Sequence, residues 1–120
     1  MSLREWSASR TSRLIFWAAF TFSLVMAVLP HPPELPGEPN DKVQHMAAFL
    51  TLGFLSSWAY PSTALLQLLV RLSLFGALIE LIQAVPSLYR DSDPLDWVAD
   101  TVAAAVALAI VFWWRRRRFG

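Results

Sequence analysis

The sequence predicts an all-α membrane protein, an antiparallel bundle of four transmembrane helices with both termini in the cytoplasm. Hydrophobic residues make up 56% of the 120 residues and charged residues only 16%, whereas soluble domains carry about 25% charged residues. The apolar residues gather in four runs that are separated by proline-containing turns. Seven of the ten basic residues lie in the two terminal segments, and basic residues favour the cytoplasmic side of a membrane.

The first predicted span covers residues 14–29 and follows a basic cytoplasmic segment, residues 1–13. Small residues at the positions that signal peptidase needs are missing near Leu29, so we expect a retained helix rather than a cleaved signal peptide. Residues 30–40 contain five prolines. Because proline removes a backbone donor and restricts the preceding residue, we expect an exposed loop there.

The second predicted span, residues 43–60, begins beside Asn40 and Asp41, either of which suits a helix N-cap. The third, residues 66–88, follows the turn at Pro61. We place its end at residue 88 because this register lets Arg71 reach the membrane interface, where a charge is tolerated.

The fourth predicted span, residues 95–114, completes a membrane domain that covers residues 14–114. Pro94 suits the first position of a helix, and the small residues Ala103 and Ala104 allow close helix approach. The span ends at a basic cytoplasmic tail, residues 115–120.

The predicted orientation brings polar residues of three spans to the outer side at similar depth. They occur in pairs three or four residues apart, so each pair shares one helical face. Pointing such faces at lipid is costly, which favours convergence inside the bundle. The predicted ligand-binding residues are Asp41, Lys42, His45, Glu80, Gln83, Arg90, Asp96 and Asp100.

Purely structural roles compete with this interpretation. An acid such as Asp96 stabilises a helix N-terminus without any function. Glu80 and Gln83 can serve interhelical hydrogen bonds, but these are worth only about 0.6 kcal/mol on average, so a carboxylate at Glu80 favours function. His45 can either bond a neighbouring carboxylate or act as a general base.

A metal centre and a nucleic-acid partner are not predicted. Asp96 and Asp100 with His45 and Glu80 could offer nitrogen and oxygen ligands, but a single histidine without HExxH spacing disfavours a metal site. The chain has no cysteine, so thiolate sites are excluded. We therefore predict no cofactor, and no basic patch on a soluble fold indicates nucleic-acid binding.

The ordered motifs Asp41-Lys42-x-x-His45, Glu80-x-x-Gln83, Arg90 and Asp96 with a polar residue four positions later resemble the VanZ-like family of small bacterial membrane proteins. The resemblance covers about residues 41–107. The family often has Asn at the position of Asp100 and Gly at that of Ala103 or Ala104. The resemblance implies a multi-pass protein of the bacterial inner membrane, in a family named for a protein linked to teicoplanin resistance.

Three functions remain open. In the first, the outward-facing pocket binds a lipid head group or a lipid-linked or glycopeptide-related envelope intermediate, with Lys42 and Arg90 holding an anion. In the second, His45 and a protonated Glu80 act as base and acid in hydrolysis or group transfer on an amphiphilic substrate. In the third, the polar pairs only fix the packing of the helices.

Overall fold

The computed structural model describes residues 3–28, 41–85 and 94–119, and the regular secondary structure within these ranges is helical. The four helices are α1 (Leu3–Val28), α2 (Asp41–Ala59), α3 (Leu65–Gln83) and α4 (Pro94–Phe119). The prediction of an all-α chain with four helices is therefore confirmed.

The helix boundaries differ from the predicted spans at several ends. Helix α1 begins at Leu3 and α4 continues to Phe119, so the basic terminal segments are helical as well. Helix α3 ends at Gln83 rather than near residue 88. The amide of Ala84 donates to the Glu80 carbonyl at 3.1 Å, and the following Pro86 disfavours a helical backbone and supplies no donor.

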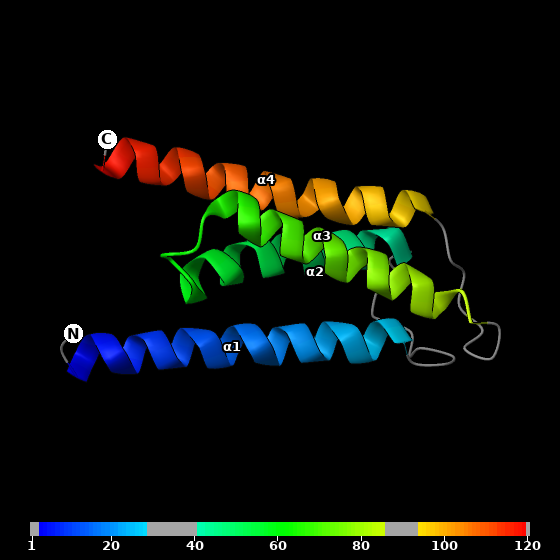
Figure 1. Ribbon diagram of the computed structural model, residues 1–120, viewed down its shortest axis with the longest axis horizontal. Helices are drawn as coiled ribbons and strands as arrows, with labels where there is room; N and C mark the ends of the chain where they lie inside the picture. Colours follow the sequence, from blue (N-terminus) through cyan, green and yellow to red (C-terminus); the bar gives the residue numbers. More distant parts are fainter. Residues whose placement is uncertain (1–2, 29–40, 86–93, 120) are drawn as a thin grey trace.

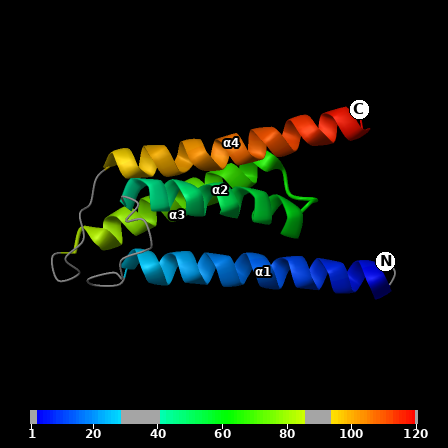
Figure 2. The same ribbon diagram turned by 180° about the vertical axis from the view of Figure 1, so that it is seen from behind.

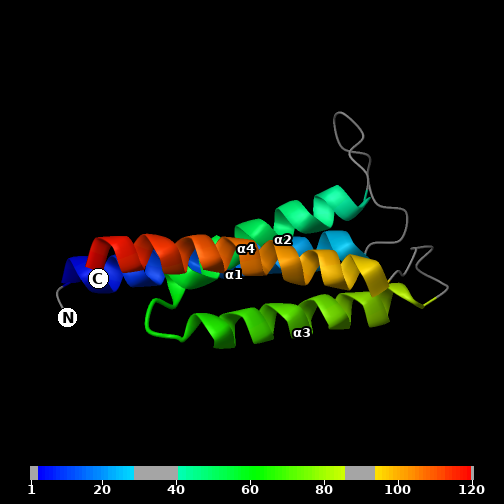
Figure 3. The same cartoon turned by 90° about the horizontal axis from the view of Figure 1, so that it is seen from above.

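The helices lie along the 49 Å axis of a bundle that is 27 Å wide in both other directions. Successive helices alternate in direction, and both termini lie at the same end (Figure 1; Figure 2). In Figure 1, α4 and α1 lie at opposite edges of the bundle, with α2 and α3 between them. Seen from above, α4 lies over α1, and α2 and α3 lie on opposite sides of that pair (Figure 3). Helix α2 packs against all three other helices, so its residues reach every part of the bundle.

Aromatic and small residues form the core contacts. Phe75 of α3 stacks on Phe20 of α1 with ring centroids 4.1 Å apart and lies 5.7 Å from the Phe49 ring of α2. Helices α2 and α4 run in the same direction and meet at Gly53, where a β-carbon would lie 2.7 Å from the Ala107 β-carbon. Small residues permit this approach.

Large apolar side chains cover the outside while polar side chains lie inside. Phe22, Leu74 and Ile110 are exposed, whereas Glu80, Gln83 and Asp100 are buried. Water would reverse this distribution, and lipid favours it. Three helices are long and apolar enough to cross a membrane, namely Ser9–Val28, Leu65–Gln83 and Pro94–Arg118.

Helix α2, which corresponds to the predicted second span, is not among these three segments. Its first turn carries Asp41, Lys42 and His45, which lower its mean hydropathy. Because α2 packs against all the other helices, neighbouring helices rather than lipid surround much of its surface.

Candidate functional site

His45, Glu80 and Asp100 meet inside the bundle, one from each of α2, α3 and α4. His45 and Glu80 are each 8% exposed and Asp100 is fully buried. The Nδ1 atom of His45 lies 3.6 Å from Oδ2 of Asp100. One nitrogen or oxygen atom from each of the three side chains lies within 4.8 Å of the others. We call these three residues the buried cluster.

The cluster concentrates charge where the surroundings are apolar. Two carboxyl groups this close in a low-dielectric interior repel each other when both are ionised, which favours a shared proton or a nearby positive charge. His45 beside Asp100 offers one positive charge when it is protonated. The arrangement therefore suits proton exchange or the binding of a cation.

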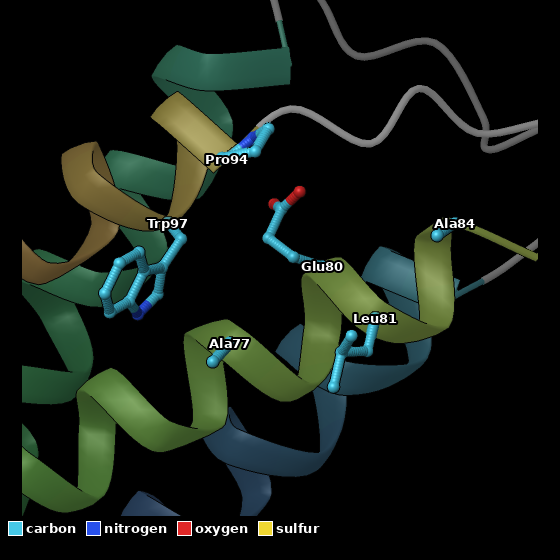
Figure 4. A pocket seen from close by; sticks show the side chains of 6 residues that line it. All are labelled: Ala77, Glu80, Leu81, Ala84, Pro94 and Trp97. Carbon is cyan, nitrogen blue, oxygen red and sulfur yellow. The ribbon is translucent and has the colours of Figure 1, made fainter.

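A groove of about 330 Å³ opens beside the cluster, between α3 and the start of α4. Figure 4 shows Glu80 extending from α3 across the groove, with Pro94 and Trp97 of α4 on the far wall. Ala77, Leu81 and Ala84 of α3 line the near wall. Glu80 is the single titratable side chain among the lining residues, so it connects an apolar groove to the buried cluster.

Hydrogen bonds fix the groove wall formed by Trp97. The indole Nε1 donates to the Ser73 carbonyl at 3.0 Å and lies 3.1 Å from the Ser73 hydroxyl. The same hydroxyl lies 3.0 Å from the Thr101 hydroxyl of α4. These contacts hold α3 against α4 about two helical turns from Glu80 along α3, so the width of the groove is set by packed side chains.

The other predicted ligand-binding residues do not all join the cluster. Gln83 is fully buried and its Nε2 donates to the Ala27 carbonyl of α1 at 2.8 Å, which is the helix-packing role. Asp96 is buried in the first turn of α4, where an acid stabilises the helix dipole. Asp41 and Lys42 belong to the first turn of α2, and their side chains lie outside the described residues, as does Arg90.

The apolar residues that line the groove were not among the predicted site residues. Ala77 and Ala84 lie three residues before and four residues after Glu80, so they share its face of α3, and Leu81 lies at the edge of that face. Small residues on both sides of a carboxylate leave space around it. That pattern was the signal in the sequence for a groove at Glu80. The approach of Trp97 and Pro94 to Glu80, in contrast, depends on how α4 packs against α3.

The opposite end of α2 has a different chemistry, in which arginines bind backbone carbonyls. The Ser57 carbonyl would normally accept from the amide four residues later, but Pro61 has none. Arg115 Nη2 of α4 donates to this carbonyl at 3.0 Å. Arg13 Nε of α1 donates to the Ala59 carbonyl at 3.5 Å, and its guanidinium lies over the Tyr60 ring.

Comparisons of the chain with protein-family models, with characterised proteins and with solved structures find no match. The likeness to the VanZ-like family therefore stays a prediction that rests on its motif residues.

Proposed function

We propose that this chain crosses the bacterial inner membrane four times, with both termini in the cytoplasm, and binds a lipid head group or a lipid-linked envelope intermediate at its outer side. One observation carries the proposal. Glu80 belongs both to the buried cluster and to a groove whose other walls are apolar. An amphiphile needs both surfaces, an apolar one for its chain and a polar one for its head group.

The exposed surface supports a ligand that arrives from lipid. Leu81 and Trp97 line the groove and are themselves exposed on the outside of the bundle. The groove is therefore continuous with the apolar surface that lipid would cover. A hydrocarbon chain can enter sideways without crossing water. In this proposal, Lys42 and Arg90 supply the positive charge for an anionic head group, and the resemblance to the VanZ-like family favours an envelope molecule.

The orientation rests on the basic residues. Arg13 and Arg115 lie at the same end of α2, and α4 ends in Arg116, Arg117 and Arg118. This is the end where both termini lie (Figure 1). The positive-inside rule assigns such an end to the cytoplasm. The buried cluster then lies toward the outer side.

Cysteine labelling tests the orientation, because the chain has no cysteine of its own. Ser62→Cys, in the turn before α3, should react only from the cytoplasm, and Ser87→Cys, after α3, only from outside. A membrane-impermeant maleimide applied to whole cells and to inverted vesicles distinguishes the two sides. Labelling of both positions from one side would contradict four spans.

Native mass spectrometry of gently purified protein tests the ligand. We expect an amphiphile to co-purify with the wild type and to be lost from His45→Ala and from Ala77→Phe, which fills the groove. Ala109→Phe adds the same side chain at an exposed position of α4 and should retain the ligand. Equal co-purification in all four proteins would overturn the proposal.

A second candidate function is hydrolysis or transfer on the same amphiphile. The observation that favours it is the 3.6 Å approach of His45 to Asp100, since a carboxylate that orients an imidazole supports general-base catalysis. Glu80 would then act as the acid from the groove wall. Glu80→Gln preserves the size of the side chain, so turnover should fall sharply while binding survives. If the polar pairs serve only helix packing, the protein should show neither binding nor turnover of an amphiphile.

A further inference from the structure

Three helices each bring one metal-ligating side chain to the same buried point. His45 of α2, Glu80 of α3 and Asp100 of α4 present one nitrogen and two oxygen donors within 4.8 Å of one another. We propose that the buried cluster binds one divalent transition-metal ion, of the class that includes Zn²⁺. This site goes beyond the binding of an amphiphile and does not depend on it.

The spacing of the donors is close to that of a coordination sphere. Two ligands on a tetrahedral ion with bonds of about 2.0–2.1 Å lie roughly 3.4 Å apart. The His45 Nδ1 and Asp100 Oδ2 atoms lie 3.6 Å apart, so these two donors need little movement. The Glu80 side chain has three rotatable bonds and can bring a carboxylate oxygen to the same distance.

The charge of the cluster matches a divalent ion. Two carboxylates and a neutral imidazole carry a charge of −2, which one divalent cation cancels. Such cancellation matters most where the side chains are buried, because ionised groups are costly in a low-dielectric interior. The same residues that are expensive to bury as separate ions are inexpensive to bury as a neutral metal complex.

The donor set selects the class of ion. Imidazole suits zinc, iron and copper, and carboxylates also suit manganese. Ions that require thiolate are excluded because the chain has no cysteine. Among the divalent ions that accept one nitrogen and two oxygens, Zn²⁺ is bound more tightly than Mn²⁺ or Fe²⁺. Zn²⁺ is therefore the probe for affinity, and Co²⁺ is the probe for geometry.

Three protein ligands leave a coordination position for another molecule. Zinc sites with three protein ligands hold water or substrate in the remaining position. Glu80 borders the groove, so a molecule in the groove reaches the cluster from that side. An oxygen of an anionic head group is a suitable fourth ligand. This last step rests on the proposed function, whereas binding of the ion itself rests on the three side chains.

The test is metal uptake by the full chain, purified in detergent without a histidine tag and stripped with EDTA. After exposure to ZnCl₂ and removal of excess, elemental analysis should find one zinc per chain. Glu80→Gln and Asp100→Asn should weaken binding by about tenfold or more. His31→Ala and Glu34→Gln make comparable changes outside the cluster and should bind as the wild type does. Co²⁺ should give the intense visible absorption of a tetrahedral site.

Two measurements on the wild type keep the outcome decisive if a variant fails to fold. Zn²⁺ should raise the unfolding temperature of the stripped protein, and the Co²⁺ spectrum should disappear when Zn²⁺ is added. A folded wild type that takes up no stoichiometric metal would overturn the proposal, and so would equal uptake by the cluster variants. Lipid co-purification without metal uptake would leave the proposed function standing and remove only the metal site.

Discussion

The two ends of helix α2 use charged and polar residues in opposite ways. At its carboxyl end, Arg115 and Arg13 donate to backbone carbonyls that Pro61 and the helix terminus leave without helical partners. At its amino end, His45 is buried against Asp100 of α4. The first arrangement completes the hydrogen bonding of a helix and needs no ligand. The second gathers ionisable groups in the interior, which adds little stability and suits a binding site.

The largest expected effect comes from breaking the His45–Asp100 pair on one side only. Asp100→Ala should destabilise the bundle by about 3–5 kcal/mol, because it removes the carboxylate that faces the buried His45 imidazole. The double variant His45→Leu/Asp100→Leu should recover most of this loss, since well-packed apolar residues often replace a buried ion pair without cost. Unfolding in detergent with increasing SDS measures both. Metal and amphiphile binding should be absent from the double variant.

The double variant decides between function and structure at this end. Recovery of stability with loss of binding would show that the buried cluster exists for its ligand. If the double variant were instead as unstable as the sum of the single changes His45→Leu and Asp100→Leu, the polar residues would be structural. The two ends of α2 would then differ in their chemistry, but both would serve to stabilise the bundle.

A smaller effect is expected at Gly53, which lies between the two ends of α2. A β-carbon there would lie 2.7 Å from the Ala107 β-carbon and 3.3 Å from the Ala104 carbonyl oxygen. Gly53→Ala should therefore push α2 away from α4 and destabilise the bundle by about 1–3 kcal/mol. Because His45–Asp100 and Ser57–Arg115 are both contacts between these helices, both ends should weaken together.

Gly76→Ala is the matched control for this change. Its nearest neighbours are aromatic side-chain atoms of Trp97 and Phe49 at 3.3 and 3.4 Å, and side chains adjust more easily than a backbone. Thermal unfolding in detergent should rank Gly53→Ala as clearly the less stable variant. Equal stability of the two variants would mean that α2 and α4 can separate without loss.

Much of the fold follows from the sequence because apolar runs and prolines are local signals. Pro61 and Pro86 mark helix ends and Pro94 marks a start, and the helices observed are bounded accordingly. The start of α1 at Leu3 was missed because its Arg and Ser residues lower the hydropathy without opposing a helix. The predicted end of the third span, residue 88, lies outside the described residues, and α3 itself ends at Gln83, before Pro86.

The sequence predicted that His45, Glu80 and Asp100 converge, because they lie at a similar depth in the membrane. It did not predict which of the eight candidate residues would form the buried cluster. Depth follows from the position along each span, whereas contact depends on the rotation of each helix about its axis. Gly53, Ala104 and Ala107 set that rotation for α2 and α4. Small residues are common on many faces of these helices, so the contacting face cannot be chosen without the packing. Short turns place successive helices side by side and antiparallel. They do not indicate that α2 and α4, which are parallel and not successive, pack against each other.

At the carboxyl end of α2, Arg115→Ala should cost about 1–2 kcal/mol of stability, because the Ser57 carbonyl loses its donor. Arg115→Lys should recover part of this loss, since an ammonium group can donate to the same oxygen. Arg116→Ala removes an exposed arginine from the same helix and serves as the control. Amphiphile binding should be unchanged in all three folded variants. A loss of binding in Arg115→Ala alone would show that the two ends are coupled.

The smallest effect on stability is expected for Trp97→Phe, which changes a residue of the groove wall near the amino end of α4. Phenylalanine keeps an aromatic wall but removes the indole donor to Ser73, and an interhelical hydrogen bond in a membrane contributes about 0.6 kcal/mol on average. Ser73→Ala removes the hydroxyl that contacts both Trp97 and Thr101 and should have an effect of similar size. Affinity for the amphiphile should fall more in Trp97→Phe, because only this variant changes a side chain that lines the groove. Equal losses of affinity in the two variants would place the ligand elsewhere, since Ser73 is not among the residues that line the groove.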